Sequence, residues 1–168
     1  YSEKVDGFCL VSSDSDFTRL ATRLREAGMA VYGIGEKKTP NPFIVACDKF
    51  IYIEILKHQA SESELESTET TTTTKNDYDI ITKKEIRFIA ATIDDVADDD
   101  GWAFLGDVGS LLQKKQPNFD SRNYGFQKLT PLIKSISAFE IERREDSRGR
   151  MKLIYVKLKE VKPKGKKR

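Results

Sequence analysis

The chain has 168 residues, of which 38% are hydrophobic and 33% charged, a composition typical of one medium or two small soluble domains. No apolar run approaches the ~20 residues that a membrane-spanning helix needs. The polar start, Tyr-Ser-Glu-Lys, does not have the form of a signal peptide, so we expect no membrane contact. Cys9 and Cys47 both lie in apolar runs, which predicts two buried thiols and a reducing, cytoplasmic setting.

Charge is segregated along the chain. Residues 1–57 carry eight basic and eight acidic side chains, residues 58–82 one and six, and residues 83–168 carry 20 and 13. From Arg122 onward there are 15 basic and five acidic residues. This segregation predicts a C-terminal part that binds a polyanion.

The first 57 residues have the pattern of a parallel β–α–β unit that continues into a third strand. We expect a strand over 5–11, a helix that ends before Gly28, a strand over 29–35, a helical turn over 43–47 and a strand over 50–56. The run 8–11 is typical of a strand buried on both faces of a parallel sheet. Three strands form only part of an α/β domain, and so small a sheet cannot easily cover both faces. We therefore expect upstream residues or another chain to complete it.

Hydroxyls and carboxylates follow the first predicted strand, in the sequence Ser12-Ser13-Asp14-Ser15-Asp16. Ligands of open α/β sheets bind outside the carboxyl ends of the strands. Asp14 and Asp16 can share a Mg²⁺ ion that positions water for phosphodiester cleavage. Alternatively, Ser13 or Asp14 caps the next helix and Asp16 complements its dipole, and the residues alone favour this interpretation. Asp48 is a further candidate ligand, with a loop acid or cap as its alternative.

The rest of the chain predicts a linker, a second domain and a tail. Residues 58–82 are acidic and rich in Ser and Thr, which indicates a linker without a core. Residues 83–160 have the plan of a winged helix-turn-helix. Its expected elements are helices over 83–97, with Thr82 as N-cap, 106–113 and 126–136, and strands over 139–144 and 152–158. Residues 161–168 form a basic tail.

Several aromatic and basic residues of this second domain are candidates for nucleic-acid contact. We expect Trp102, Phe104 and Phe119 in the core. Tyr124 and Phe126 flank a glycine at the start of a predicted helix and can stack on an unpaired base. The candidate phosphate contacts are Lys128, Lys134, Arg143, Arg144, Arg148 and Arg150. The alternative is a solvated basic hairpin, and phosphate contacts do not read sequence in either case.

Both halves resemble known families. Residues 8–53 are similar to the second half of an NYN domain, of the PIN-like nuclease group that includes the LabA-like proteins. The matching segments are Leu-Val-Ser-Ser-Asp-Ser-Asp-Phe, Leu-Arg-Glu-Ala-Gly, Val-Tyr-Gly-Ile-Gly and Ala-Cys-Asp-Lys-Phe. Residues 83–159 resemble a LOTUS (OST-HTH) domain. Its matching segments are Gly101-Trp102, Leu-Gly-Asp-Val-Gly-Ser-Leu-Leu, Pro-Asn-Phe-Asp, Tyr-Gly-Phe-Gln-Lys-Leu and the terminal hairpin.

The resemblance implies a role in RNA metabolism. NYN domains resemble ribonucleases that depend on Mg²⁺ or Mn²⁺, and their acid motif falls on Asp14 and Asp16. The leading Asp of the family's first strand has no counterpart in this chain, so we expect an incomplete acid set and no activity of this segment alone. LOTUS domains are similar to RNA-binding winged helices, and some dock an RNA helicase.

The expected fold is thus an α/β domain with part of a PIN-like, Rossmann-like parallel sheet, followed by an α+β winged helix-turn-helix. The expected function is an RNA-associated protein, with a non-catalytic adaptor for a partner such as an RNA helicase as the alternative. DNA binding is the weaker hypothesis. In the helix predicted over 126–136, the only side chains that could contact base edges are Gln127, Lys128, Thr130 and Lys134.

Overall fold

The computed structural model describes residues 5–56, 78–145 and 152–159. Its contacts divide the chain into two compact units. The sheet unit comprises residues 1–79 and 112–125, and the wing unit comprises residues 80–111 and 126–168. Among the described residues, no helix combines the length and the apolar character needed to cross a bilayer. Residues 58–77 of the linker expected over 58–82 lie outside the described residues, as do Arg148, Arg150 and the tail expected over 161–168.

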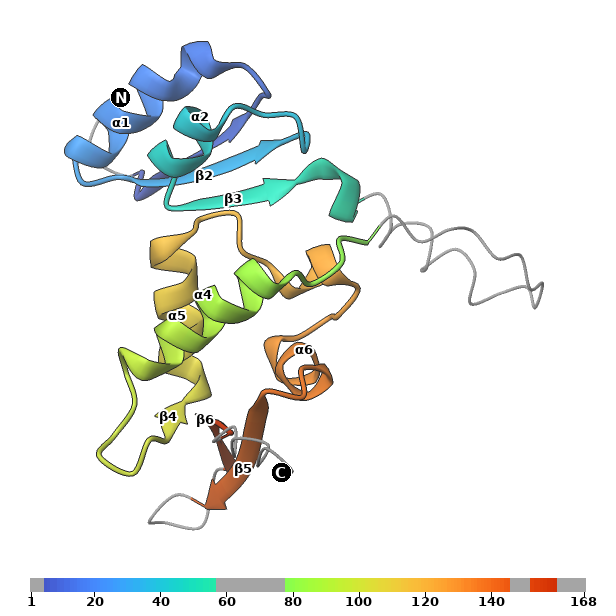
Figure 1. The fold of residues 1–168 in the computed structure, drawn as a ribbon. Helices are drawn as coiled ribbons and strands as arrows, with labels where there is room; N and C mark the ends of the chain where they lie inside the picture. Colours follow the sequence, from blue (N-terminus) through green and yellow to red (C-terminus); the bar gives the residue numbers. More distant parts are fainter. Residues whose placement is uncertain (1–4, 57–77, 146–151, 160–168) are drawn as a thin grey trace, which may run out of the picture. The chain divides into compact units, whose positions relative to one another are not determined.

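A three-stranded parallel sheet forms the centre of the sheet unit. Its strands are β1 (Gly7–Val11), β2 (Ala30–Gly35) and β3 (Lys49–Tyr52), paired in that order. Parallel neighbours require crossover connections, and helices α1 (Thr18–Glu26) and α2 (Asn41–Ala46) supply them. Both helices lie on the same side of the sheet (Figure 1). The parallel α/β arrangement expected from the sequence is confirmed.

The described residues cover only one face of this sheet. The core between the sheet and its two helices consists of Ala21, Val31, Phe43, Ile44, Ala46, Cys47 and Phe50. Successive side chains of a strand point to opposite faces, so Cys9 and Val11 lie with Tyr32 on the face away from the helices. Val11 is 69% exposed and Tyr32 47% exposed. The expectation that residues 8–11 are buried on both faces is therefore wrong, and so is the expectation that Cys9 is buried.

The end of α1 is set by local sequence, whereas the end of β3 is not. Gly28 ends α1 in the left-handed conformation, with φ 80°, and the Met29 N–H donates to the Leu24 carbonyl at 3.0 Å, as in a Schellman cap. The strand predicted over 50–56 stops at Tyr52, and residues 53–56 turn into a helix instead. Strand propensity depends strongly on context, and in this helical turn Ile55 is buried and Glu54 Oε1 accepts the Lys37 N–H at 3.1 Å.

The wing unit combines helices with an antiparallel sheet. In chain order its elements are α4 (Lys83–Asp94), β4 (Ala103–Phe104), α5 (Leu105–Lys115), which begins in this unit, α6 (Leu129–Ser135), β5 (Phe139–Glu145) and β6 (Lys152–Leu158). The strand order is β4-β6-β5. Three helices followed by a hairpin confirm the winged-helix plan. The sequence did not indicate β4, since two residues are too few to show an alternating pattern.

Buried side chains from all these elements form the core of the wing unit, namely Ile89, Ile93, Ala103, Leu105, Val108, Leu132, Ile133, Ile136, Phe139 and Val156. Helix α4 begins after Thr82, as expected, where a capping box joins Thr82 to Glu85. The Glu85 carboxylate accepts the Thr82 backbone N–H at 2.6 Å.

Helix α6 begins three residues later than the sequence suggested. The predicted helix over 126–136 would place Pro131 in its interior, where proline removes a hydrogen bond and clashes with the preceding turn. The observed start at Leu129 places Pro131 in the first turn, where backbone N–H groups have no intrahelical partner. Lys128 remains extended, with φ −139° and ψ 155°.

Candidate functional site

Asp14 and Asp16 follow β1 at the carboxyl edge of the parallel sheet. Asp14 is the N-cap of a short 3₁₀ helix, Ser15–Phe17, that leads into α1. One oxygen of its carboxylate, Oδ1, accepts the Asp16 backbone N–H at 3.0 Å. Both acids are exposed. The geometry thus gives Asp14 the capping role that the residues alone favoured.

Ser12 and Ser13 connect the turn after β1 to the end of β2. The Ser13 hydroxyl accepts the Glu36 backbone N–H at 2.8 Å, just after β2. The Ser12 N–H donates to the Ile34 carbonyl at 2.9 Å, and its Oγ accepts the Asp14 N–H at 3.1 Å. These bonds hold the turn in a fixed position beside the carboxyl edge.

Asp48 lies at the other end of the sheet. It precedes β3, and its Oδ2 accepts the backbone N–H of Val31, near the start of β2, at 2.8 Å. Its Oδ1 lies 2.9 Å from Nε of Arg25. Strand starts and strand ends lie at opposite edges of a parallel sheet. The structure therefore does not bring Asp48 to Asp14 and Asp16, contrary to the expectation that it is a third ligand.

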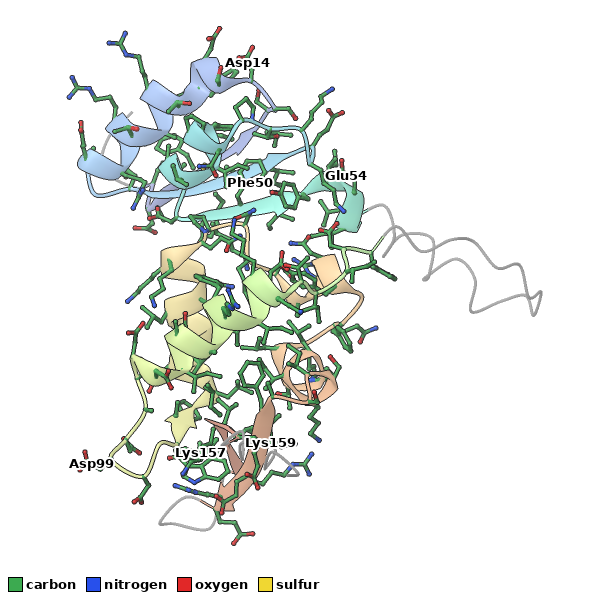
Figure 2. The ribbon with its side chains drawn as sticks, in the orientation of Figure 1. Asp14, Phe50, Glu54, Asp99, Lys157 and Lys159 are labelled. Atoms are coloured by element: carbon green, nitrogen blue, oxygen red, sulfur yellow. The ribbon has the colours of Figure 1, made fainter. Side chains whose placement is uncertain are left out.

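The donor set at the carboxyl edge does not fit a Mg²⁺ site. Two further acids follow strands at this edge, but Glu36 is paired with Lys38, at 2.6 Å, and Glu54 Oε1 accepts the Lys37 N–H at 3.1 Å. Figure 2 shows Asp14 and Glu54 well apart. Among the described residues, no group of three or more His, Cys, Asp or Glu side chains could hold a metal ion. We therefore assign no cleavage step to these residues.

Tyr124 ends a second short 3₁₀ helix, Ser121–Tyr124, which Asp120 caps. The Tyr124 ring lies 6.2 Å from the ring of buried Phe119, and Gly125 then adopts the left-handed conformation, with φ 81°. A bidentate pair between Asp120 and Arg122 fixes this loop, at 2.6 and 3.0 Å. Burial raises the pKa of Asp120, but these bonds from Arg122 outweigh it and hold the pKa below its ordinary value.

The candidate phosphate contacts have different surroundings. Lys128 precedes α6 and Lys134 lies in its last turn, and both are exposed. Arg143 is exposed on β5. Its neighbour Arg144 points to the opposite face of the strand, where its Nη2 lies 3.0 Å from Glu142 Oε2. Lys128, Lys134 and Arg143 are thus better placed to meet a phosphate backbone than Arg144.

The surroundings of Trp102 differ from those that we predicted. It was expected in the core, but it is only partly buried. The Arg144 guanidinium carbon lies 5.1 Å from the centroid of the Trp102 ring. Strand β4, which begins at the next residue, places this ring at the sheet. Without β4 in the prediction, no signal in the sequence distinguished Trp102 from a core aromatic.

Comparisons with known proteins give two family matches and two similar structures. Residues 1–54 match the NYN domain, and residues 80–151 match the OST-HTH/LOTUS domain. An uncharacterized protein of Nitrosomonas europaea is 32% identical over 55% of this chain and 90% of its own, with a TM-score of 0.43. A protein of Chromobacterium violaceum is 30% identical over 44% of this chain and 78% of its own, with a TM-score of 0.36. The search of curated proteins produced no match.

Proposed function

The chain contains part of an NYN domain followed by an OST-HTH/LOTUS domain, and we propose that it is an RNA-associated protein whose OST-HTH/LOTUS part binds RNA. The observation that carries this proposal is the order of the two families, because ribonuclease-type and RNA-binding domains occur together in one chain. The basic excess after Arg122 supports it, since lysine and arginine neutralise phosphates and release counterions.

The geometry of the winged helix favours RNA binding over sequence-specific DNA binding. A DNA recognition helix lies in the major groove and presents several side chains to base edges. Helix α6 has only seven residues, and two of the predicted readers, Gln127 and Lys128, precede it. Exposed Lys128, Lys134 and Arg143 suit phosphate contacts that position a strand without reading its sequence.

Salt dependence tests the proposal. The 168-residue chain is titrated into a labelled single-stranded RNA at several salt concentrations, and binding is followed by fluorescence anisotropy. The logarithm of the association constant should fall linearly with the logarithm of salt concentration, by about 0.7 per phosphate contact. Replacing Lys128, Lys134 and Arg143 together by Ala should reduce that slope by about 2 and weaken binding equally for unrelated sequences.

A charge-matched control replaces exposed Lys38, Lys83 and Lys84 by Ala and should leave the slope within error of the unaltered protein. Absence of RNA binding by the unaltered protein at low salt would overturn the proposal. Salt-insensitive capture of a protein partner such as an RNA helicase, without RNA binding, would instead support the adaptor alternative.

Metal-dependent RNA hydrolysis is a second candidate, favoured by the NYN match alone, because Asp14 and Asp16 do not by themselves form a Mg²⁺ site among the described residues. A divalent ion such as Mg²⁺ or Mn²⁺ would supply the activated water for that chemistry. The test incubates RNA with the protein in Mg²⁺ or in EDTA. Cleavage that requires Mg²⁺ and disappears in Asp14→Asn and Asp16→Asn, but persists in Asp107→Asn, supports the candidate. Equal cleavage by Asp14→Asn and the unaltered protein would exclude it.

A further inference from the structure

The outer face of the wing sheet, opposite the face that buries Ala103 and Val156, carries a fixed stack of aromatic and cationic side chains. The Arg144 guanidinium lies over the Trp102 ring, at 5.1 Å, and over the Tyr155 ring, at 4.6 Å. Two hydrogen bonds to Glu142 Oε2, at 3.0 and 3.2 Å, hold that guanidinium in place. A cation over an aromatic face is attracted by the ring quadrupole. The orientation of the Trp102 ring is therefore set before any ligand binds.

The strand register extends this stack into a rigid platform. Tyr155 of β6 lies opposite Phe104 of β4 and opposite Glu142 of β5, and the Phe104 and Tyr155 ring centroids are 5.9 Å apart. Rigid aromatic side chains provide contact area with little loss of conformational entropy. Trp102, at the edge of this platform, is thus suited to stacking.

Beside Trp102 lies an open hollow of about 500 Å³, lined by Trp102, Glu140, Lys157, Leu158 and Lys159. This volume falls in the range of small-ligand pockets, ~300–1,000 Å³. Glu140 and Lys157 are direct cross-strand neighbours. The Lys159 N–H donates to the Ala138 carbonyl at 2.9 Å, which extends the ladder just beyond β6, so Lys157 and Lys159 lie on one face. Figure 2 labels both lysines in this part of the wing unit.

We propose that this hollow binds an unpaired RNA nucleotide, with its base stacked on Trp102 and its flanking phosphates beside Lys157 and Lys159. The inference rests on the RNA binding proposed above and assigns it a subsite. An aromatic ring next to two ammonium groups matches a base next to its phosphates, and every base has a face that can stack. Bases of a duplex are already stacked, so a single strand is the matching form.

The acidic loop that precedes Trp102 limits the electrostatic part of this binding. Asp98, Asp99 and Asp100 are exposed, and the Asp100 carbonyl accepts a hydrogen bond from Lys157 Nζ at 2.6 Å. These carboxylates repel phosphates and acidic peptides alike. Stacking on Trp102 is therefore the larger contribution, and its loss should lower affinity without a change in the salt slope.

Trp102 is the single tryptophan of the sequence, so its fluorescence reports directly on the hollow. Titration of the 168-residue chain with a short oligoadenylate should quench this fluorescence with the same dissociation constant that anisotropy gives. A duplex of equal length should leave the fluorescence unchanged. Removal of a stacking aromatic weakens binding by about tenfold or more, so Trp102→Ala should lose about tenfold in affinity at every salt concentration.

Two further variants keep the test informative if Trp102→Ala destabilises the wing unit. Trp102→Phe retains a smaller ring and should lose less affinity than Trp102→Ala. Lys157→Ala/Lys159→Ala should weaken binding and reduce the salt slope, whereas Lys83→Ala/Lys84→Ala on α4 should change neither.

The outcomes separate the subsite from the general function. RNA binding without quenching, and with unaltered affinity in Trp102→Phe and Lys157→Ala/Lys159→Ala, would overturn the subsite and leave the proposed function intact. Absence of any RNA binding would overturn both. Quenching by a polyglutamate peptide, with no quenching by RNA, would mean that the hollow binds acidic peptides and would also overturn the subsite.

Discussion

The two sheets of this chain meet solvent in opposite ways. In the sheet unit, the face away from α1 and α2 carries bare apolar side chains, and Val11 is 69% exposed. In the wing unit, the outer face carries Tyr155 and Trp102, and the Arg144 guanidinium lies over both rings. An apolar surface left open indicates a place for a further layer. In the wing sheet a cation thus lies over the outward-facing rings, whereas in the described part of the first sheet one face leaves apolar side chains open.

This difference has a direct consequence for stability. Burial of apolar area supplies most of the favourable free energy of folding, and a main described core of the sheet unit lies between its sheet and two helices. The loss of one large side chain from that interface should therefore have a large effect. The wing unit, with its separate core, should be insensitive to the same change.

Phe43→Ala should produce the largest effect. Phe43 is fully buried, and its ring lies 6.4 Å from that of Phe17 and 5.9 Å from that of Phe50. Truncation of a buried Phe lowers the free energy of unfolding by about 3–5 kcal/mol. Circular dichroism during denaturant titration should show early loss of part of the signal, while Trp102 fluorescence, which reports on the wing unit, keeps its midpoint.

Val45→Ala is the matched control, since Val45 lies on the same helix and is 50% exposed. This exposed substitution should change the free energy of unfolding by less than about 0.5 kcal/mol. A shift of the Trp102 fluorescence midpoint in Phe43→Ala would contradict the independence of the two units.

The two cysteines test which face of the first sheet is covered. Cys9 is exposed and Cys47 is buried. Burial, assisted by the nearby Asp48 charge, raises the pKa of the Cys47 thiol to about 11. The thiolate is the nucleophile, so a neutral-pH thiol reagent should label Cys9 at least about a hundredfold faster than Cys47. Labelling of single-cysteine variants Cys9→Ser and Cys47→Ser, followed by mass spectrometry, measures the two rates.

The labelling rate of Cys47 should increase as the pH rises. Because the Cys47 pKa is raised, its thiolate fraction stays low at neutral pH and continues to increase until the pH approaches about 11. In denaturant, both thiols should react at the same rate. Equal rates in the folded protein would contradict the one-sided sheet.

Local signals explain what the sequence predicted well. Gly28 and Thr82 were assigned as helix ends because their roles depend on neighbouring residues within one turn. The order of strands and helices followed from apolar periodicity in the same way. Pro131 could have corrected the start of α6, since its ring alone forbids the longer helix.

Contacts between distant residues explain what the sequence did not reveal. Asp48 pairs with Arg25 and Val31, which are 23 and 17 positions away, and nothing local distinguishes it from a metal ligand. The stacking of Arg144 on Trp102 depends on the register of β4, β6 and β5, and β4 itself was not predicted. For Cys9, alternation along β1 indicates two faces but not which one the helices cover.

Each unit has an N-cap residue, and substitutions at these two residues should have the smallest effects on stability. Thr82 belongs to a capping box with Glu85, and Thr82→Ala should lower the free energy of unfolding by about 1 kcal/mol, visible in the Trp102 midpoint. Asp14 caps an exposed 3₁₀ turn through one bond to the Asp16 N–H, so Asp14→Ala should have a smaller effect. Asn caps as well as Asp, and Asp14→Asn should therefore leave stability unchanged. Any loss of RNA cleavage in Asp14→Asn would then reflect chemistry at the carboxylate. If Asp14→Ala instead lost as much stability as Thr82→Ala, this turn would support the sheet unit more than its exposure indicates.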